Sequence, residues 1–184
     1  MEPAKVYYAK DEFLETHTGN KVGLKSLVRG STNIMLSGKC IISPGAIIRG
    51  DLAKIAIGKY TIIREDVVVR PSYKRTKGQL KYISLHIGEY VYVDRGSIVC
   101  ASKIGNNVHI GENCVISHRC VIKDNSRILD NSVLSPDTEV PPFTVFGGCP
   151  AVYLMDMPES TPFMHKESTM GYYQRFTQRP RQAG

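Results

Sequence analysis

Histidine and cysteine are the side chains of this chain most suited to catalysis or metal binding. His109 and His118 lie near one another, and the cysteines stand at positions 40, 100, 114, 120 and 149 without a Cys-x-x-Cys pair. A catalytic histidine needs a cleft and an orienting partner. The pattern around the two histidines offers neither, so both are predicted to be solvent-facing. Cys100 gives an alternative, a reactive thiol whose pKa is lowered by the nearby cation of Arg95.

A repeat of six residues positions these candidates. Neither a helix nor a strand has this period. Three positions after each repeated apolar residue, from Asn107 to Asp137, stands an asparagine, an aspartate or an arginine. Asparagine and aspartate tolerate the left-handed backbone of a sharp corner. Each hexad is therefore predicted to be a short strand followed by a corner. The apolar positions are Ile104, Ile110, Ile116, Ile122, Ile128, Leu134, Val140, Phe146 and Val152.

Three hexads would close a triangular coil of about 18 residues, the hexapeptide type of β-helix. One such coil buries few aliphatic side chains, so its stability depends on the coils above and below. Cys114 and Cys120 fall in the small inward slots, where a thiol serves as a compact apolar group. The fold class predicted is an all-β solenoid, a parallel β-helix of hexapeptide repeats with a C-terminal α-helix.

The repeat also sets the predicted domain boundaries. Earlier hexads extend it towards the N-terminus, so the β-helix is predicted over residues 30–152, after an N-terminal segment at 1–29. Residues 71–86 are predicted to leave the coil as a loop, because the hexad register would place Arg75 and Lys81 inside. Residues 147–151, GGCPA, are predicted to end the coil.

Residues 153–184 are predicted to form a helix and a basic tail. Thr161 and Pro162 suit the start of a helix over residues 161–177. Its apolar stripe would consist of Phe163, Met170, Tyr173 and either Tyr172 or Phe176, and would lie back on the coil. The tail from Thr177 onward, TQRPRQAG, is predicted to be disordered.

Composition favours a soluble protein in a reducing compartment. The 184 residues carry a formal net charge of +7, and no nucleic-acid-binding signature accompanies the charge. The N-terminus lacks the apolar core of a signal peptide, and no apolar run could span a membrane. We therefore expect a cytoplasmic protein with neither nucleic-acid partners nor direct membrane insertion.

Part of the chain resembles the superfamily of γ-class carbonic anhydrases and hexapeptide transferases. The resemblance rests on IIRGDLAKIAIGKYTIIREDVVVR and HIGEYVYVDRGSIVCASKIGNNVHIG, which flank the excursion loop. It implies a left-handed β-helix and, in the anhydrases, three histidine ligands for a metal. The matching positions hold Arg70, Arg95 and Cys100. A guanidinium offers no lone pair to a cation, so no catalytic residue, metal or cofactor is predicted. A trimeric γ-carbonic anhydrase-like metalloenzyme or a hexapeptide acyltransferase stays the alternative function.

The transferase alternative and an adhesion motif have little support. Transferases of this superfamily end the coil with a G-x-P-A-K string, whereas Val152 replaces the lysine here. Arg49-Gly50-Asp51 matches an integrin-binding tripeptide, but a cytosolic chain would not meet integrins. In the resembling superfamily the Arg and Asp pair across a subunit boundary, so a structural ion pair is expected.

A closer resemblance covers nearly the whole chain, on the strings DEFLETHTGNKV, LVRGSTNI, ILDNSVLSPDTEVPPFTVFGGCP and YYQRF. These resemble the dynactin subunit 5 family. The resemblance implies a non-catalytic structural and protein-interaction subunit of the dynactin pointed-end complex, which supports dynein-driven transport along microtubules and the attachment of cargo or adaptors.

The same resemblance implies partners and a location. The partners would be dynactin subunit 6, which is a second β-helix, dynactin subunit 4, the pointed-end actin-related protein and dynein cargo adaptors. The location would be the cytoplasm and cytoskeleton, with the kinetochore as a further site. The excursion loop combines cations and aromatic side chains that can bind an acidic protein surface. The candidate subunit contacts are Arg49, Asp51, Tyr73, Lys74, Arg75, Lys77, Tyr82, Tyr173 and Phe176.

Overall fold

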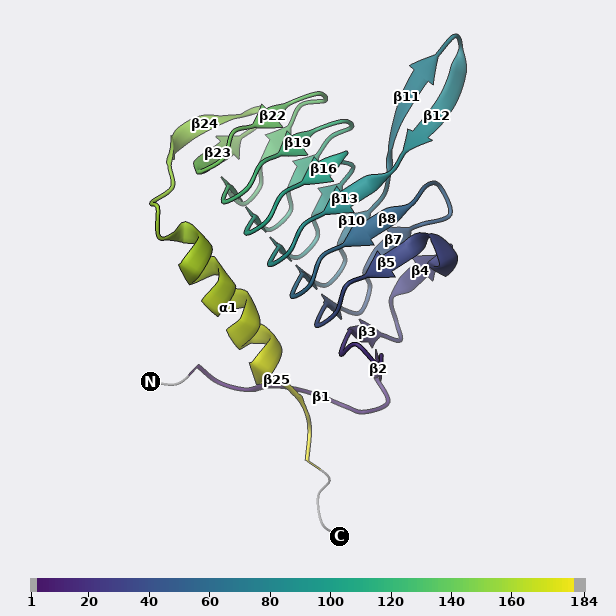
Figure 1. The fold of residues 1–184 in the computed structure, drawn as a ribbon, viewed down its shortest axis with the longest axis vertical. Coiled ribbons are helices and arrows are strands. Elements are labelled where there is room, and N and C mark those ends of the chain that lie inside the picture. Colours follow the sequence, from purple (N-terminus) through teal and green to yellow (C-terminus); the bar gives the residue numbers. More distant parts are fainter. Residues whose placement is uncertain (1–2, 181–184) are drawn as a thin grey trace.

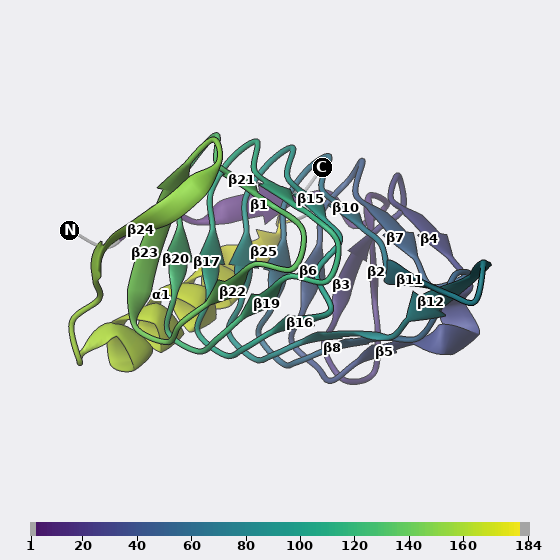
Figure 2. The same ribbon diagram turned by 90° about the horizontal axis from the view of Figure 1, so that it is seen from above.

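The chain folds as a parallel β-solenoid with one helix along its side (Figure 1). A computed structural model describes residues 3–180. Successive turns of the coil stack along one axis (Figure 2), and the strands of each turn belong to three different sheets. The fold class predicted from the hexads is confirmed.

Three sheets form the sides of the coil, and their strands are parallel except for β2 and β24 at the two ends of sheet I. Sheet I has nine strands, in the spatial order β2 (Phe13–Glu15), β3 (Lys21–Gly23), β6 (Ile41–Ile42), β9 (Ile62–Ile63), β14 (Tyr92–Val93), β17 (His109–Ile110), β20 (Arg127–Ile128), β23 (Thr144–Gly148) and β24 (Ala151–Asp156). Sheet II has six, β4 (Leu27–Arg29), β7 (Ile47–Arg49), β10 (Val68–Val69), β15 (Ile98–Val99), β18 (Val115–Ile116) and β21 (Val133–Leu134). Sheet III has six, β5 (Ile34–Leu36), β8 (Ile55–Ile57), β13 (Leu85–Ile87), β16 (Lys103–Ile104), β19 (Val121–Ile122) and β22 (Glu139–Val140).

The second residue of each two-residue strand points into the coil. The side chains of Ile104, Ile110, Ile116, Ile122, Ile128, Leu134 and Val140 are fully buried, and Phe146 packs against them. The predicted corner residues Asn107, Asn113, Arg119, Asn125, Asn131 and Asp137 all have positive φ, between 52° and 64°. The predicted inward column and its corners are therefore confirmed over this run.

Val152 is the exception in that column. Its side chain is 55% exposed, because the chain reverses after β23 and β24 pairs with it antiparallel. The coil thus ends at the predicted GGCPA string, one hexad before the predicted register would end. The prediction that Val152 points inward is wrong, since no further coil continues the register beyond Phe146.

The first turn and the excursion also differ from the predicted outline. β3 and β4 already pair in parallel with β6 and β7, so parallel stacking starts before residue 30. A short 3-10 helix, η1 (Ser31–Asn33), precedes β5. The excursion is an ordered antiparallel hairpin of β11 (Ser72–Thr76) and β12 (Gln79–Ile83), which projects from the coil in Figure 1.

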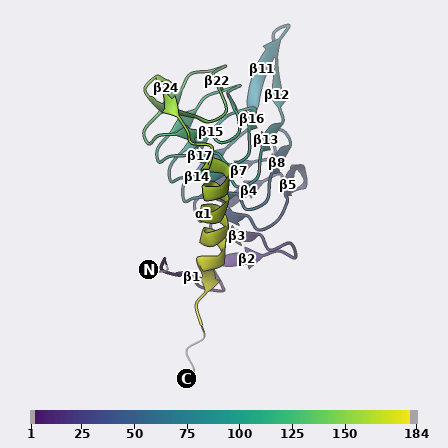
Figure 3. The same ribbon diagram turned by 60° about the vertical axis from the view of Figure 1, so that its left-hand side comes forward.

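Helix α1 (Thr161–Arg175) runs back along sheet I towards the N-terminal end of the coil, as Figures 1 and 3 show. There β25 (Phe176–Gln178) pairs in parallel with β1 (Val6–Tyr8). The predicted disorder is therefore wrong for Thr177 and Gln178, whose backbone is held by β1. Residues 181–184 of the predicted tail lie outside the described residues.

Aromatic side chains fix the end of α1 to the coil. Phe176 stacks on Tyr8, with ring centroids 4.7 Å apart, and packs with the outward side chains of Ile41 and Ile62. The helix has a weak apolar stripe, and Phe163, predicted to belong to it, is 66% exposed. Tyr172 and Tyr173 in the last turn of α1, and Phe176 directly after it, contact the coil, and His165 and Thr169 pack earlier along the helix.

Candidate functional site

The vacated ligand positions lie on either side of sheet II. Arg70 follows β10 and Cys100 follows β15, and the pairing of Val69 with Val99 makes them neighbours at one corner of the coil. The backbone N–H of Arg70 donates to the carbonyl of Val99 at 3.0 Å. Arg95 precedes β15 and lies at the opposite corner, where its Nε donates to Glu65 at 3.1 Å. Within one chain, therefore, only Arg70 and Cys100 come together.

The chemistry of this corner does not suit a cation. Guanidinium groups repel a metal ion and cannot ligate it. Across residues 3–180, no group of three or more histidine, cysteine, aspartate or glutamate side chains is arranged to hold a metal. The residues present therefore do not fit the three-ligand metal site of the resembling anhydrases.

Cys100 is not an activated thiol. Only 7% of its surface is exposed, and burial raises its pKa, although the guanidinium of Arg70 acts in the opposite direction. The cation beside it is Arg70 rather than the predicted Arg95, because the hexad places residues 95 and 100 at different corners. A thiol with a raised pKa stays protonated near neutral pH, so the reactive-thiol alternative is wrong.

His109 points out of the coil but is not solvent-facing. It lies beneath α1, between Tyr92 and His165, with ring centroids 5.2 and 6.3 Å away. Desolvation, with a smaller contribution from Arg127, lowers its pKa to about 4. The prediction of an exposed ring is wrong, because the repeat alone could not show which face α1 covers.

His118 is also outward and partly covered. The ring of Tyr73 lies over it, with centroids 4.3 Å apart, and burial followed by Arg70 and Arg119 lowers its pKa. No carboxylate orients its ring, and its buried Nδ1 has no hydrogen-bond partner in the part of the chain that is described. Neither histidine is therefore arranged as a general base.

The Arg49-Gly50-Asp51 turn forms its ion pair within the chain. Arg49 Nε and Nη2 each donate to a carboxylate oxygen of Asp51 at 2.8 Å. A side chain at Gly50 would collide with Ile34, since a Cβ there would come within 2.5 Å of it. Glycine at position 50 therefore lets the backbone pass close to Ile34 of the neighbouring turn. Asp51 already pairs with Arg49 in the same chain, so the expected pairing across a subunit boundary is not required.

The hairpin carries five of the predicted contact residues. Tyr73 faces Tyr82 across the ladder, and the cationic residues Lys74, Arg75 and Lys77 are exposed. Its base is tied to the coil because Arg119 donates to the carbonyl of Tyr73 at 2.7 Å and Ser72 donates to the carbonyl of Cys100. The hairpin thus projects from a fixed base beside Arg70 and Cys100. Its role in contacting other subunits stays a prediction.

Tyr173 and Phe176 serve the chain itself. Phe176 is buried under the N-terminal strand, and Tyr173 donates to the carbonyl of Gly19 at 2.5 Å. Burial raises the pKa of Tyr173 to about 12. Because Phe176 is buried within the chain, it is not available as a surface contact, and that prediction is wrong. The apolar spacing predicted that these rings pack against the coil, but it did not identify Tyr8 and Ile41 as the residues that they contact.

The outward columns of the three sheets are the features that the hexad analysis missed. They are formed by the residue immediately before each inward aliphatic, and they differ in character. Sheet I shows Lys21, Ile41, Ile62, Tyr92, His109, Arg127 and Val145; sheet II shows Leu27, Ile47, Val68, Ile98, Val115 and Val133; sheet III shows Met35, Ala56, His86, Lys103, Val121 and Glu139. Because each sheet takes every third strand of the coil, assigning every third hexad to the same side would have predicted these three columns from the sequence.

The column of sheet II is wholly aliphatic, yet α1 lies on sheet I. Leu27 and Ile98 are 44% and 39% exposed, and the others are half-buried by their neighbours in the column. The column of sheet I, by contrast, includes Ile41 and Ile62, which are fully buried under the N- and C-terminal segments. Sheet II is thus the apolar side of the coil that the described chain leaves open.

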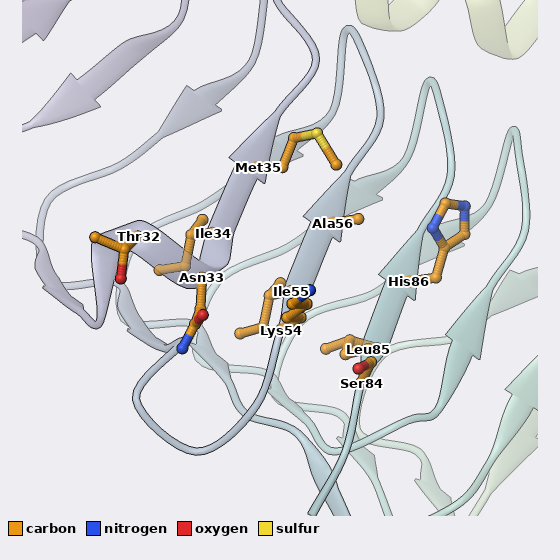
Figure 4. A pocket seen from close by; sticks show the side chains of 10 residues that line it. All are labelled: Thr32, Asn33, Ile34, Met35, Lys54, Ile55, Ala56, Ser84, Leu85 and His86. Carbon is orange, nitrogen blue, oxygen red and sulfur yellow. The ribbon is translucent and has the colours of Figure 1, made fainter.

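A cavity of about 440 Å³ opens on sheet III. Figure 4 shows Met35, Ala56 and His86 in a row on three adjacent strands, with Ile55 and Leu85 beside them. Its lining is mainly apolar, and Lys54 supplies a cation at one edge. Ser84 and His86 also line the cavity, but no hydrogen bond joins their side chains in the described part of the chain.

Within residues 3–180, no helix combines the length and apolar character needed to cross a bilayer.

Comparison with known proteins gives matches of two kinds. A family model described as dynactin subunit 5 matches residues 1–181. A protein of Dictyostelium discoideum named dynactin subunit 5 is 47% identical over 176 residues, which cover 96% of this chain and 89% of that protein. Both matches extend well beyond the repeats.

Solved structures share the fold at low sequence identity. A hexapeptide transferase family protein from Anaplasma phagocytophilum has a TM-score of 0.66 at 22% identity, over 87% of this chain and 92% of its own. AntD, an N-acyltransferase from Bacillus cereus solved with dTDP and 3-hydroxybutyryl-CoA, has a TM-score of 0.69 at 14% identity, over 89% and 96%. At such identities the likeness extends to the coil and not to its chemistry.

Proposed function

The chain belongs to the dynactin subunit 5 family, and from this membership we propose that it is a non-catalytic structural and protein-interaction subunit of the dynactin pointed-end complex. In this role it supports dynein-driven transport along microtubules and the attachment of cargo or adaptors. It works in the cytoplasm, on the cytoskeleton and at the kinetochore.

The observation that carries the proposal is the family match over nearly the whole chain. The chemistry of the old ligand corner agrees with it. Arg70 and Cys100 supply a cation and a buried, protonated thiol where the anhydrases need metal ligands. A rigid coil without such chemistry acts through the surfaces that it presents.

Assembly with other dynactin components follows from the family. The specific partners proposed are dynactin subunit 6, dynactin subunit 4, the pointed-end actin-related protein and dynein cargo adaptors. A stacked β-helix suits such a role because its outward columns hold side chains in a fixed, flat array, with strands about 4.8 Å apart.

An acyltransferase function is the alternative that the fold neighbours suggest. General base catalysis needs a histidine that can accept a proton near neutral pH beside a substrate cleft. His109 is covered by α1 and has a pKa of about 4, and His118 lacks an orienting carboxylate. We therefore propose a scaffold rather than an enzyme.

The test is affinity purification of the tagged full-length chain from cytosol of its own cell, followed by quantitative mass spectrometry. We expect the actin-related protein and the other pointed-end subunits in fixed ratio to the tagged chain. A chain recovered free of every dynactin component would overturn the proposal. Stoichiometric zinc or iron that is lost in Cys100→Ala would instead favour the metalloenzyme.

A further inference from the structure

An unbroken row of aliphatic side chains crosses the turns on the outside of the coil in the open column of sheet II, which consists of Leu27, Ile47, Val68, Ile98, Val115 and Val133. Its members lie side by side in register on six strands. At a strand spacing of about 4.8 Å the column is about 24 Å long. Contiguous exposed apolar surface of this kind is typical of a protein interface, since isolated proteins seldom leave it open to water.

A cationic edge borders this column at the corner with sheet III. Arg70 lies there, its Nε is buried, and that atom has no hydrogen-bond partner in the described chain. The hairpin that starts beside it adds Lys74, Arg75, Lys77 and Lys81, and the span from β11 to β12 contains no acidic residue. Four of these five cations thus project beyond the coil from one fixed base.

Three other corner arginines have carboxylate partners within the chain, although Arg29, in register with Arg49, forms no ion pair among residues 3–180. Arg49 pairs with Asp51 at 2.8 Å, Arg95 with Glu65 at 3.1 Å and Arg119 with Asp137 at 2.7 Å. Arg70 forms no such pair among residues 3–180. The half-buried Arg70 guanidinium therefore has no carboxylate partner within the described chain, and an acidic group from outside the chain could pair with its charge.

We infer that sheet II and the cationic edge form one docking surface for a different protein chain, which presents a flat aliphatic face bordered by aspartate or glutamate side chains. The aliphatic column supplies the dry centre of the interface, and Arg70 with the hairpin cations selects and orients the acidic border. The inference rests on the proposed function, because the occupant is taken to be another subunit of the same complex.

A second copy of this chain fits the surface less well. Each copy carries a formal net charge of +7, so pairing two copies would bring like charges together. The hairpin offers no acidic residue to another hairpin. Charge therefore favours an acidic partner of a different sequence.

The first test compares two valines at equivalent positions of neighbouring hexads. Val115 lies in the open column of sheet II and Val121 in the mixed column of sheet III, and both are half-buried. In full-length tagged chains purified from cytosol, Val115→Asp should reduce recovery of a dynactin subunit at least about tenfold, because it places a charge in the dry interface. Val121→Asp should retain wild-type recovery. Thermal unfolding of both variants establishes that both fold.

The second test locates the acidic border in the purified wild-type complex. A zero-length carbodiimide joins a lysine amine to a carboxylate that it contacts. Cross-links should join Lys74, Lys77 or Lys81 to aspartate or glutamate of another subunit, and Arg70→Glu should reduce recovery of that same subunit. Lys103→Glu, on the sheet III column, is the control for charge reversal.

The outcomes separate the two proposals. If wild type recovers dynactin subunits and Val115→Asp recovers them equally, the docking surface is wrong and the proposed function stands. If wild type recovers none, the proposed function falls, and the inference falls with it. A homodimer in light scattering that Val115→Asp dissociates, with subunit recovery unchanged, would show that a second copy covers sheet II and would also overturn the inference.

Discussion

Sheets I and II are built from the same hexads and differ in what their outward residues meet. The outward column of sheet I includes Ile41 and Ile62, which the chain buries under Tyr8 and Phe176. The outward column of sheet II is aliphatic on all six strands, and residues 3–180 provide no such cover for it. The inward slots therefore fix the coil, whereas the outward slots decide which side the chain covers itself and which side it offers to others.

The largest expected effect is the difference in stability between a substitution on the inward face of sheet II and one on its outward face. Ile116 is fully buried and Val115, its neighbour, points outward. Ile116→Asp should bury an unpaired charge between turns and prevent soluble expression. Ile116→Ala should lower the free energy of unfolding by about 2–5 kcal/mol. Val115→Asp should leave the isolated chain folded, as judged by circular dichroism and urea titration. If Ile116→Asp is as soluble as Val115→Asp, the inward face is misassigned.

The next effect tests the cover on sheet I. Phe176→Ala should destabilise the chain by about 3 kcal/mol, because the ring is buried against Tyr8 and the coil. Hydrogen exchange of α1 should accelerate in this variant. Phe163→Ala is the matched control, since that ring lies on α1 and is exposed, whereas Phe176 follows the helix as the first residue of β25. Equal destabilisation by the two substitutions would mean that the last turn does not hold the helix.

A pH dependence of similar size follows from His109 under the same cover. Its folded pKa of about 4 is below its ordinary value of 6.5, so the unfolded chain binds the proton more readily. The contribution of neutral His109 to the free energy of unfolding is fully present above about pH 6.5. It is lost as the pH falls towards 4, by about 3 kcal/mol at most. Urea unfolding at pH 7 and pH 5 measures this loss. His109→Gln should weaken the dependence, and an unchanged profile would contradict the assignment.

The smallest expected effect is at His118, which is outward at the corner below the hairpin. His118→Ala removes a ring contact with Tyr73 but opens no cavity in the coil. We expect a change in the free energy of unfolding of less than about 0.5 kcal/mol. A loss of several kcal/mol in urea titration would show that the hairpin base depends on this ring.

Features of the fold that repeat in every hexad could be predicted from the sequence, whereas features that depend on distant contacts could not. The inward column and its corners were predictable, because every hexad places an aliphatic residue at the same position and, three residues later, mostly a residue that tolerates positive φ. Val152 and the first two residues of the tail, Thr177 and Gln178, were mispredicted, since the antiparallel return of β24 and the pairing of β25 with β1 depend on contacts distant in sequence.

The vacated ligand site shows the same limit. The types of Arg70, Arg95 and Cys100 already argued against a metal, because that argument depends only on the donor atoms. Their separation to two corners depends on which side of the coil each hexad forms, and the six-residue period alone does not give that. Nor does it give the burial of His109, since the hexads do not state which side α1 covers.

The direct test of the account is the accessibility of sheet II in the complex. In a chain with Cys149→Ser to remove the exposed native thiol, Val115→Cys and Val121→Cys would each be labelled with a maleimide, both in the isolated chain and in purified dynactin. We predict similar labelling in the isolated chain, and at least about tenfold slower labelling at position 115 alone in the complex. Equal labelling of the two positions in the complex would contradict the account.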